Sequence, residues 1–320
     1  MHMDMPLEEL KKYQGKNPKP SDFEEYWDRA LKELGQQSLN YELVEADFQT
    51  PFADCYHLTF TGVGDAKVYA KFIKPKKHIA TGQAVAMFHG YSVDSGDWLD
   101  KLAFAAQGIT VLTLDCRGQG GRSEDTLRTK ATTMRGLIIR GLNDKNPDNL
   151  YYRNVFLDTV QTVRILQAME DVDAKRIGVY GGSQVGALAL ACAALENTVK
   201  EAVVIYPFLT DYLRVWEMDI QNSAYGEIAE FFRNTDPTHE RHEEFFTKLG
   251  YIDIQHHAPN IKANVDWYIG LRDQICPPSS QFAAYNKLTS KKTMKIYYEF
   301  GHEHLPHVGD YALQKLSKNL

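Results

Sequence analysis

The chain has 320 residues, of which 43% are hydrophobic and 24% charged, and its net charge is −6 at pH 7. This length is enough for one large α/β domain or two small ones. The negative charge argues against a nucleic-acid partner or an anionic membrane surface. We expect a cytoplasmic protein, because the charged N-terminus lacks the apolar core of a signal peptide and no run of about 18 apolar residues is present to span a bilayer.

The first 40 residues are expected to form an extension to the core. A turn at residues 18–22 precedes a helix predicted over 23–34, which stops at Gly35. Alternating apolar and polar residues then predict antiparallel strands over residues 41–47, 56–61 and 66–73.

After Pro75 the pattern changes to short, wholly apolar runs that indicate buried parallel strands. These runs cover residues 83–88, 109–115, 176–180, 202–206, 265–269 and 294–299, with helical patterns at 98–107, 152–170, 184–195 and 279–287. The alternation predicts an α/β protein with a doubly wound, mostly parallel sheet, whose ligands bind beyond the carboxyl ends of the strands. Residues 211–250 contain no apolar strand run and predict a helical cap insertion, so that a single domain spans residues 1–320.

Ser183 stands where a strand pattern meets an Ala- and Leu-rich helix pattern, directly after Gly181 and Gly182. Glycine tolerates the backbone angles and the close approach of a sharp strand-to-helix turn, so this segment predicts a nucleophile elbow. The helix N-terminus beneath the serine favours negative charge. The usual elbow pattern is G-x-S-x-G; here Val185 takes the place of the last glycine, and Gly186 follows it.

A serine hydroxyl needs a base to take its proton and a carboxylate to orient that base. In this type of fold the three follow in the order serine, acid, histidine. Asp273 and His302 come after the last two predicted strands. Taken singly, Ser183 would also suit a phosphate-binding turn, Asp273 a helix cap and His302 a structural role. Their order and their places at strand ends favour a catalytic triad.

An oxyanion hole needs two hydrogen-bond donors beside the serine. One is predicted to be the backbone N–H of Gln184, and the other the backbone N–H of Tyr91, which lies in the loop after the first parallel strand. His89 in the same loop is expected to have a structural, hydrogen-bonding role.

Two other motifs indicate different chemistry and are disfavoured. The run from His302 through His304 to His307 nearly matches the H-x-H-x-D-H metal pattern, but Pro306 replaces the aspartate. Residues 118–121 (Gly-Gln-Gly-Gly) faintly resemble a dinucleotide loop, but the third glycine and the later acid are missing. We therefore expect neither a metal nor a cofactor.

Several short motifs together carry a family resemblance. They are Arg117-Gly118-Gln119, Gly181-Gly182-Ser183-Gln184, Tyr206-Pro207-Phe208, Arg214-Val215-x-Glu217-Met218, Gly270-Leu271-x-Asp273-x-x-Cys276-Pro277-Pro278 and His302-Glu303, with an opening pattern between Pro6 and Trp27. In these motifs, and over nearly its whole length, the chain resembles carbohydrate esterase family 7, the acetyl xylan esterase and cephalosporin C deacetylase family of α/β-hydrolases.

The resemblance implies an α/β-hydrolase fold with Ser183 as nucleophile, His302 as base, Asp273 as its partner, and oxyanion donors at Tyr91 and Gln184. It implies deacetylation of xylo-oligosaccharides and of cephalosporin-type antibiotic acetates, with peroxide in place of water in some members. It also implies a homo-oligomer, a hexamer with its sites facing an internal chamber.

Val185 departs from the family pattern, and we expect it to affect activity and acyl range more than the fold. Two other functions stay open at this stage. One is a different α/β-hydrolase reaction such as peptidase-like cleavage, and the other is a non-catalytic assembly protein whose site has decayed.

Overall fold

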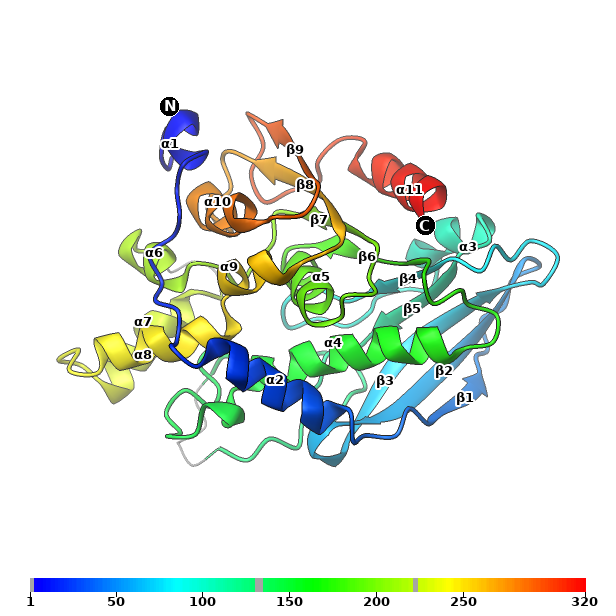
Figure 1. The fold of residues 1–320 in the computed structure, drawn as a ribbon, viewed down its shortest axis with the longest axis horizontal. Coiled ribbons are helices and arrows are strands. Elements are labelled where there is room, and N and C mark those ends of the chain that lie inside the picture. The colour runs from blue at the N-terminus through cyan, green and yellow to red at the C-terminus, as the bar shows by residue number, and fades with distance from the viewer. Residues whose placement is uncertain (1–2, 130–134, 221–223) are drawn as a thin grey trace.

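The computed structural model describes residues 3–129, 135–220 and 224–320. Within these ranges, a nine-stranded sheet runs through the molecule in the order β1-β2-β3-β5-β4-β6-β7-β8-β9 (Figure 1). The pairs β1–β2, β2–β3 and β3–β5 are antiparallel, and the other pairs are parallel. The strands are β1 Tyr41–Glu45, β2 Ala53–Gly62, β3 Ala66–Pro75, β4 Ala84–Met87, β5 Thr110–Leu114, β6 Ile177–Gly182, β7 Glu201–Ile205, β8 Asn264–Gly270 and β9 Lys292–Tyr297. The predicted doubly wound, mostly parallel sheet is confirmed.

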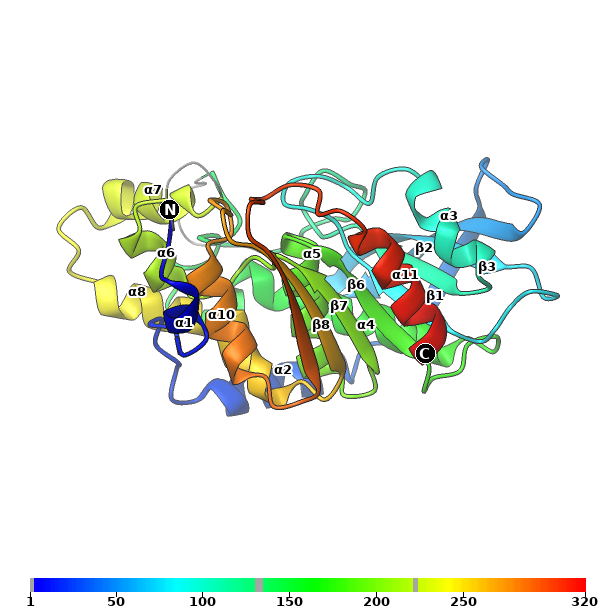
Figure 2. The same ribbon diagram turned by 90° about the horizontal axis from the view of Figure 1, so that it is seen from above.

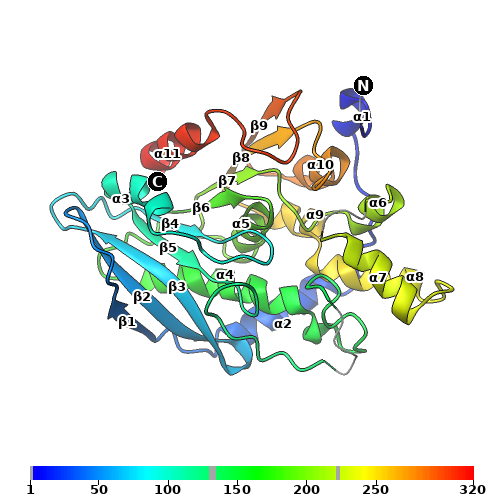
Figure 3. The same cartoon turned by 180° about the vertical axis from the view of Figure 1, so that it is seen from behind.

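Helices cover both faces of this sheet. They are α1 Leu7–Leu10, α2 Phe23–Leu34, α3 Leu102–Ala106, α4 Tyr151–Ala168, α5 Gln184–Leu195, α6 Tyr212–Glu217, α7 Gly226–Thr235, α8 His242–Leu249, α9 Ile254–His257, α10 Pro278–Lys287 and α11 Val308–Asn319. Helix α3 contacts α11 on one side, and α2 contacts α4 on the other (Figure 2, Figure 3). The sheet therefore lies between two layers of helices.

Strand β4 shows why its run of four apolar residues is continuous rather than alternating. All four residues are buried. Ala84 and Ala86 belong to the cluster that contains α4 and α5, whereas Val85 and Met87 belong to the cluster that contains α3 and α11. A strand buried on both faces needs apolar side chains at every position.

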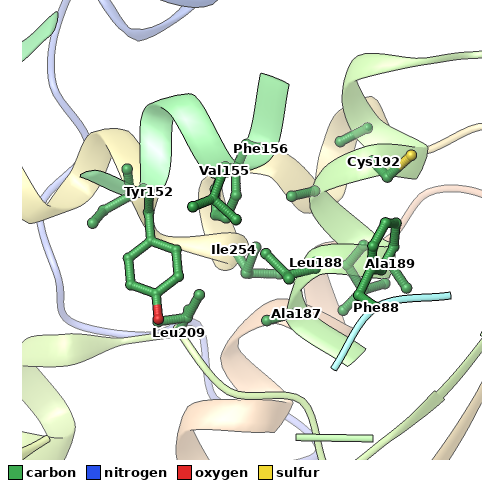
Figure 4. Close-up of a cluster of buried hydrophobic side chains, with 14 of the residues drawn as sticks. Phe88, Tyr152, Val155, Phe156, Ala187, Leu188, Ala189, Cys192, Leu209 and Ile254 are labelled. Atoms are coloured by element: carbon green, nitrogen blue, oxygen red, sulfur yellow. The ribbon is translucent and has the colours of Figure 1, made fainter. Parts of the chain in front are cut away.

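Helix α5 is the centre of the larger cluster. Its side chains Ala187, Leu188, Ala189 and Cys192 lie among those of α4 and neighbouring segments (Figure 4). The small alanines let this helix approach the sheet closely, which fixes the position of Ser183 at its N-terminal end. The four cysteines are buried and unpaired with one another.

Some elements differ from the sequence prediction. Helices α2 and α5 have the predicted bounds, but α3 is shorter than residues 98–107, because residues Leu99–Lys101 form a 3-10 turn. Helix α11 was not predicted, although its buried residues Val308, Ala312 and Leu316 repeat every four positions. Helices α6 to α9 lie between β7 and β8. No helix within residues 3–129, 135–220 and 224–320 has the length and apolar character needed to cross a membrane.

Candidate active site

Ser183 lies between the end of β6 and the start of α5. Its φ of 60° and ψ of −125° place a non-glycine residue in a sparsely populated backbone region. Such a conformation costs on the order of 1–3 kcal/mol and persists only where the surroundings enforce it. Here the Ser183 N–H donates to Ile205 O at 2.9 Å, and Ser183 O accepts from the N–H groups of Ala187 and Phe208, each at 3.1 Å. The strand, the helix and the β7 loop together hold the predicted elbow.

The structure brings the three predicted triad residues together. His302 Nε2 lies 3.1 Å from Ser183 Oγ, and His302 Nδ1 lies 2.9 Å from Asp273 Oδ2. Asp273 is fully buried, and its Oδ1 accepts the N–H groups of Ile275 and Cys276, each at 2.8 Å. Because the carboxylate only accepts, His302 donates from Nδ1, and its Nε2 is left to accept the serine proton. This arrangement can activate the hydroxyl as a nucleophile.

The ring of Tyr206 lies beside the imidazole of His302. In the sequence, Tyr206 was identified only as part of the Tyr206-Pro207-Phe208 motif, without a role of its own. Its ring centroid lies 4.4 Å from that of His302. Burial, with the charge of Asp273, raises the pKa of Tyr206 to about 12, so its hydroxyl stays neutral at ordinary pH. Residues Tyr206–Phe208 follow β7 directly, which places this ring beside the elbow.

The second predicted oxyanion donor lies in the loop after β4, and the side chain of Gln184 joins this loop to the elbow. Gln184 Nε2 donates to His89 O at 3.0 Å and to Gly90 O at 3.2 Å. Gln184 Oε1 accepts the hydroxyl of Tyr152 at 2.7 Å. The residue is fully buried. One residue therefore offers its backbone N–H at the start of α5 and fixes the loop that contains Tyr91.

His89 has the contacts of a structural histidine. Its Nε2 accepts the N–H of Cys116 at 2.8 Å, and its Nδ1 lies 2.7 Å from Gly90 O. Burial lowers the pKa of His89, which favours the neutral imidazole that these contacts need. Both ring nitrogens are occupied, so this side chain is not a competing base.

In the Arg117-Gly118-Gln119 motif, Gln119 supports the same loop and Arg117 forms a buried ion pair. Gln119 Oε1 accepts the N–H of Ser92 at 2.8 Å, and the two amide groups of Gln119 and Gln184 pair reciprocally at 3.2 Å. Arg117 is fully buried and forms a bidentate ion pair with Asp158 at 2.6 and 2.7 Å. Sequence reasoning missed these roles. The available signal was the Arg117-Gly118-Gln119 motif itself, which closely follows a buried strand.

The two disfavoured motifs have other places in the structure. Among the described residues, the only group able to offer three metal ligands is Asp273, Cys276 and His302, so His304 and His307 join no such group. In the Gly-rich segment 118–121, the N–H groups of Gly118 and Gly120 donate to protein carbonyls at 3.2 and 3.0 Å. These amides are therefore not free to bind a phosphate.

Val185 lies against the elbow glycines. A Cβ on Gly181 would overlap the Val185 side chain, so the two positions are complementary. A Cβ on Gly186 would lie 3.2 Å from Pro207 Cβ and from Gly181 O. The close approach of α5 to its neighbours therefore occurs at Gly186, one residue later than in the usual pattern.

The order of the strands, the helices on both faces and the strained serine between β6 and α5 define an α/β-hydrolase. A sequence model of the family described as acetyl xylan esterase (AXE1) matches residues 1–320, and the chain belongs to this family.

Individual relatives agree with this assignment. The chain is similar to acetyl xylan esterase 1 from Thermoanaerobacterium sp. JW/SL YS485, with 51% identity, a TM-score of 0.96, and coverage of 98% of this chain and 99% of the other. It is similar to an acetyl xylan esterase from Paenibacillus sp. R4, with 33% identity, a TM-score of 0.93, and coverage of 99% and 100%. Acetyl esterase Axe7A from Xylanibacter ruminicola is 27% identical over 294 residues, which are 90% of this chain and 64% of that protein's length.

Proposed function

We propose that this protein is a serine esterase that removes acetyl groups from small acetylated carbohydrates through an acetyl-enzyme intermediate. The observation that carries the proposal is the position of His302, whose two ring nitrogens lie within hydrogen-bond distance of Ser183 Oγ and of the buried Asp273 carboxylate. Membership of the acetyl xylan esterase family supports acetyl as the acyl group that is removed and a carbohydrate as the substrate that carries it.

In the first half-reaction, Ser183 Oγ attacks the acetyl carbonyl carbon while its proton passes to His302 Nε2. The carbonyl oxygen becomes an oxyanion and is held by the backbone N–H groups of Gln184 and Tyr91. The tetrahedral intermediate then collapses. The bond to the sugar oxygen breaks, and this oxygen takes the proton from His302 as the alcohol leaves.

In the second half-reaction, His302 takes a proton from water and the resulting hydroxide attacks the acetyl-enzyme. The bond between the acetyl carbon and Ser183 Oγ breaks, Oγ regains its proton from His302, and acetate is released. Hydrogen peroxide in place of water would give peracetic acid by the same steps.

The finer substrate and assembly proposals rest on the family resemblance. We propose xylo-oligosaccharide acetates and cephalosporin-type acetates as substrates, and a cytoplasmic hexamer with its sites facing an internal chamber. Residues 1–40 would form the extension, and residues 211–250 the cap, of one domain. Light scattering of the purified protein tests the assembly: a mass of six chains supports the hexamer, and a monomeric mass overturns it.

The test of the reaction is hydrolysis of p-nitrophenyl acetate and of longer acyl esters by wild type and Ser183→Ala, with and without a chelator. We expect the variant to lose on the order of 10⁴-fold or more in kcat, because the nucleophile is removed. Acetate should be preferred over longer acyl groups, and the chelator should have no effect. Ser317→Ala, a serine on α11, is the matched control and should keep full activity. Acetate hydrolysis that is absent, or unchanged in Ser183→Ala, would overturn the proposal.

A further inference from the structure

Glu227, on α7, joins three segments that are far apart in the sequence. Its Oε1 accepts a hydrogen bond from the hydroxyl of Tyr91. Its Oε2 accepts the N–H groups of Ile138 at 2.8 Å and of Ile139 at 3.4 Å. The Tyr91 hydroxyl oxygen in turn accepts the N–H of Leu137 at 3.1 Å. Glu227 as a whole is only 8% exposed, so these contacts are made largely out of water.

The surroundings of this carboxylate are shaped to receive it. Gly136 has a φ of 130°, which an L side chain rarely adopts, and a Cβ there would overlap the Glu227 carboxyl group. The ring of Tyr91 packs against Phe208, with centroids 5.8 Å apart and planes at 81°. The N–H of Phe208 donates to Ser183 O. Tyr91 is therefore linked to the elbow through Phe208, against which its ring packs, and to α7 through its hydroxyl.

Two buried or half-buried glutamines hold the backbone of the loop that contains Tyr91 from the core side. Gln184 binds the carbonyls of His89 and Gly90, which precede Tyr91, and Gln119 binds the N–H of Ser92, which follows it. Glu227 adds an anchor from the opposite side, through the Tyr91 side chain. Loss of this anchor would leave the Tyr91 hydroxyl with the N–H of Leu137 as its hydrogen-bond partner, so that the side chain and its peptide could shift relative to α7.

We propose that Glu227 is a positioning residue that holds Tyr91 so that its backbone N–H faces the oxyanion. This inference rests on the proposed esterase function and deepens it, because it extends the oxyanion machinery into α7, beyond the sheet and its strand-end loops. Glu227 does not touch the reacting atoms and acts only through Tyr91.

The ionisation of Glu227 adds a pH dependence to this role. Burial raises the pKa of Glu227 to about 7, although the backbone N–H groups of residues 137–139 lower it. The charged groups that face it across a cavity of about 770 Å³ are Arg135, Glu230 and Arg233. A carboxylate accepts a stronger hydrogen bond from a hydroxyl than a neutral carboxyl group does. Tyr91 is therefore held more firmly above about pH 7 than below it.

The experiment compares kcat and KM for p-nitrophenyl acetate among wild type, Glu227→Gln, Tyr91→Phe and the double variant, each corrected for the fraction of active sites by burst titration. Each single change should lower kcat about tenfold to a hundredfold, as expected for a misplaced rather than a missing donor, with KM little changed. The double variant should be no slower than the slower single variant, because both changes break the same contact. The ratio of wild-type to Glu227→Gln kcat should increase as the pH rises through about 7.

The controls separate this role from a structural one and from the parent proposal. Glu243→Gln changes an exposed carboxylate in the first turn of α8 and should leave kcat unchanged. If Ser183→Ala is inactive but Glu227→Gln has wild-type kcat per active site at every pH, the positioning role is wrong and the esterase function stands. Additive effects of the two single changes would also overturn it. Activity retained by Ser183→Ala would instead overturn the esterase proposal itself.

Discussion

The functional groups on the two sides of Ser183 are of different kinds: side-chain atoms on one side and backbone N–H groups on the other. On one side, Asp273 and His302 act through their own side-chain atoms, and each comes from the end of its own strand. On the other side, the candidate oxyanion donors are backbone N–H groups, and the side chains of Gln184, Gln119 and Glu227 serve to hold the loop that presents one of them.

This difference determines what a substitution does on each side. A change on the triad side removes a group that takes part in proton transfer, so its effect on rate should be very large. A change on the oxyanion side leaves the backbone donor in place and alters only its position, so its effect should be intermediate. The predictions below test this order, starting from the largest effect.

Asp273→Asn should lower kcat about 10⁴-fold, with little change in KM. The amide would turn its NH₂ group toward His302 Nδ1, because its oxygen is drawn to the N–H groups of residues 275 and 276. The imidazole would then carry its proton on Nε2, where it cannot accept from Ser183. Steady-state kinetics with p-nitrophenyl acetate measures this loss.

The matched control for this change is Asp266→Asn. Asp266 lies on the same strand, β8, where it accepts the hydroxyl of Thr293 at 2.6 Å and pairs with Lys315 at 3.1 Å. This variant should keep wild-type kcat. A loss of less than tenfold for Asp273→Asn would contradict the contrast between the two sides of the site.

Gln184→Met should lower kcat about tenfold to a hundredfold. The thioether has a similar length but leaves the carbonyls of His89 and Gly90 without their donor, while the backbone N–H of residue 184 is kept. The loop would therefore shift relative to the elbow. Kinetics per active site, together with thermal melting, separate a shifted donor from a loss of folded protein.

Gln161→Met is the control, because Gln161 is also fully buried and donates to a backbone carbonyl, that of Thr61, at 2.8 Å. It should lower the melting temperature without changing kcat per active site. An equal drop in kcat for both variants would mean that Gln184 has a merely structural role.

The same difference explains what was predictable from the sequence. Ser183, Asp273 and His302 could be selected because few residue types perform their chemistry and because each follows a recognisable strand. Gln119 and Glu227 could not, because their importance lies in contacts with loop amides 27 and 89 residues away in the chain. A polar side chain in a loop, such as Gln119, or on a helix, such as Glu227, gives no signal in the sequence that it will be buried against a distant loop.

Helix α11 was missed for a different reason. Its buried positions, Val308, Ala312 and Leu316, form a helical pattern, but Gly309 in the first turn and the polar residues between these positions weaken it. The buried strands were easier to predict from the sequence, because a strand that is buried on both faces, such as β4, has a continuous apolar run.

Val185→Gly should have the smallest effect and tests whether the elbow depends on the usual glycine. Helix α5 already makes its close approach at Gly186, and Val185 fills the space above Gly181. The substitution should therefore keep the fold and preserve or raise acetyl ester turnover. A glycine inside a helix costs about 1 kcal/mol, which corresponds to a fall in melting temperature of roughly 2–4 °C.

Val185→Gly both removes an apolar contact and makes the helix backbone more flexible. Val185→Ala separates these two effects, since alanine removes the apolar contact without the added backbone flexibility. If both variants keep their turnover and only the glycine variant melts earlier, the valine acts as packing and the geometry of the elbow is set by Gly186. If both lose most of their activity, the valine side chain is itself part of the site. In that case, side-chain identity on the helix side of Ser183 would matter as much as it does at Asp273 and His302.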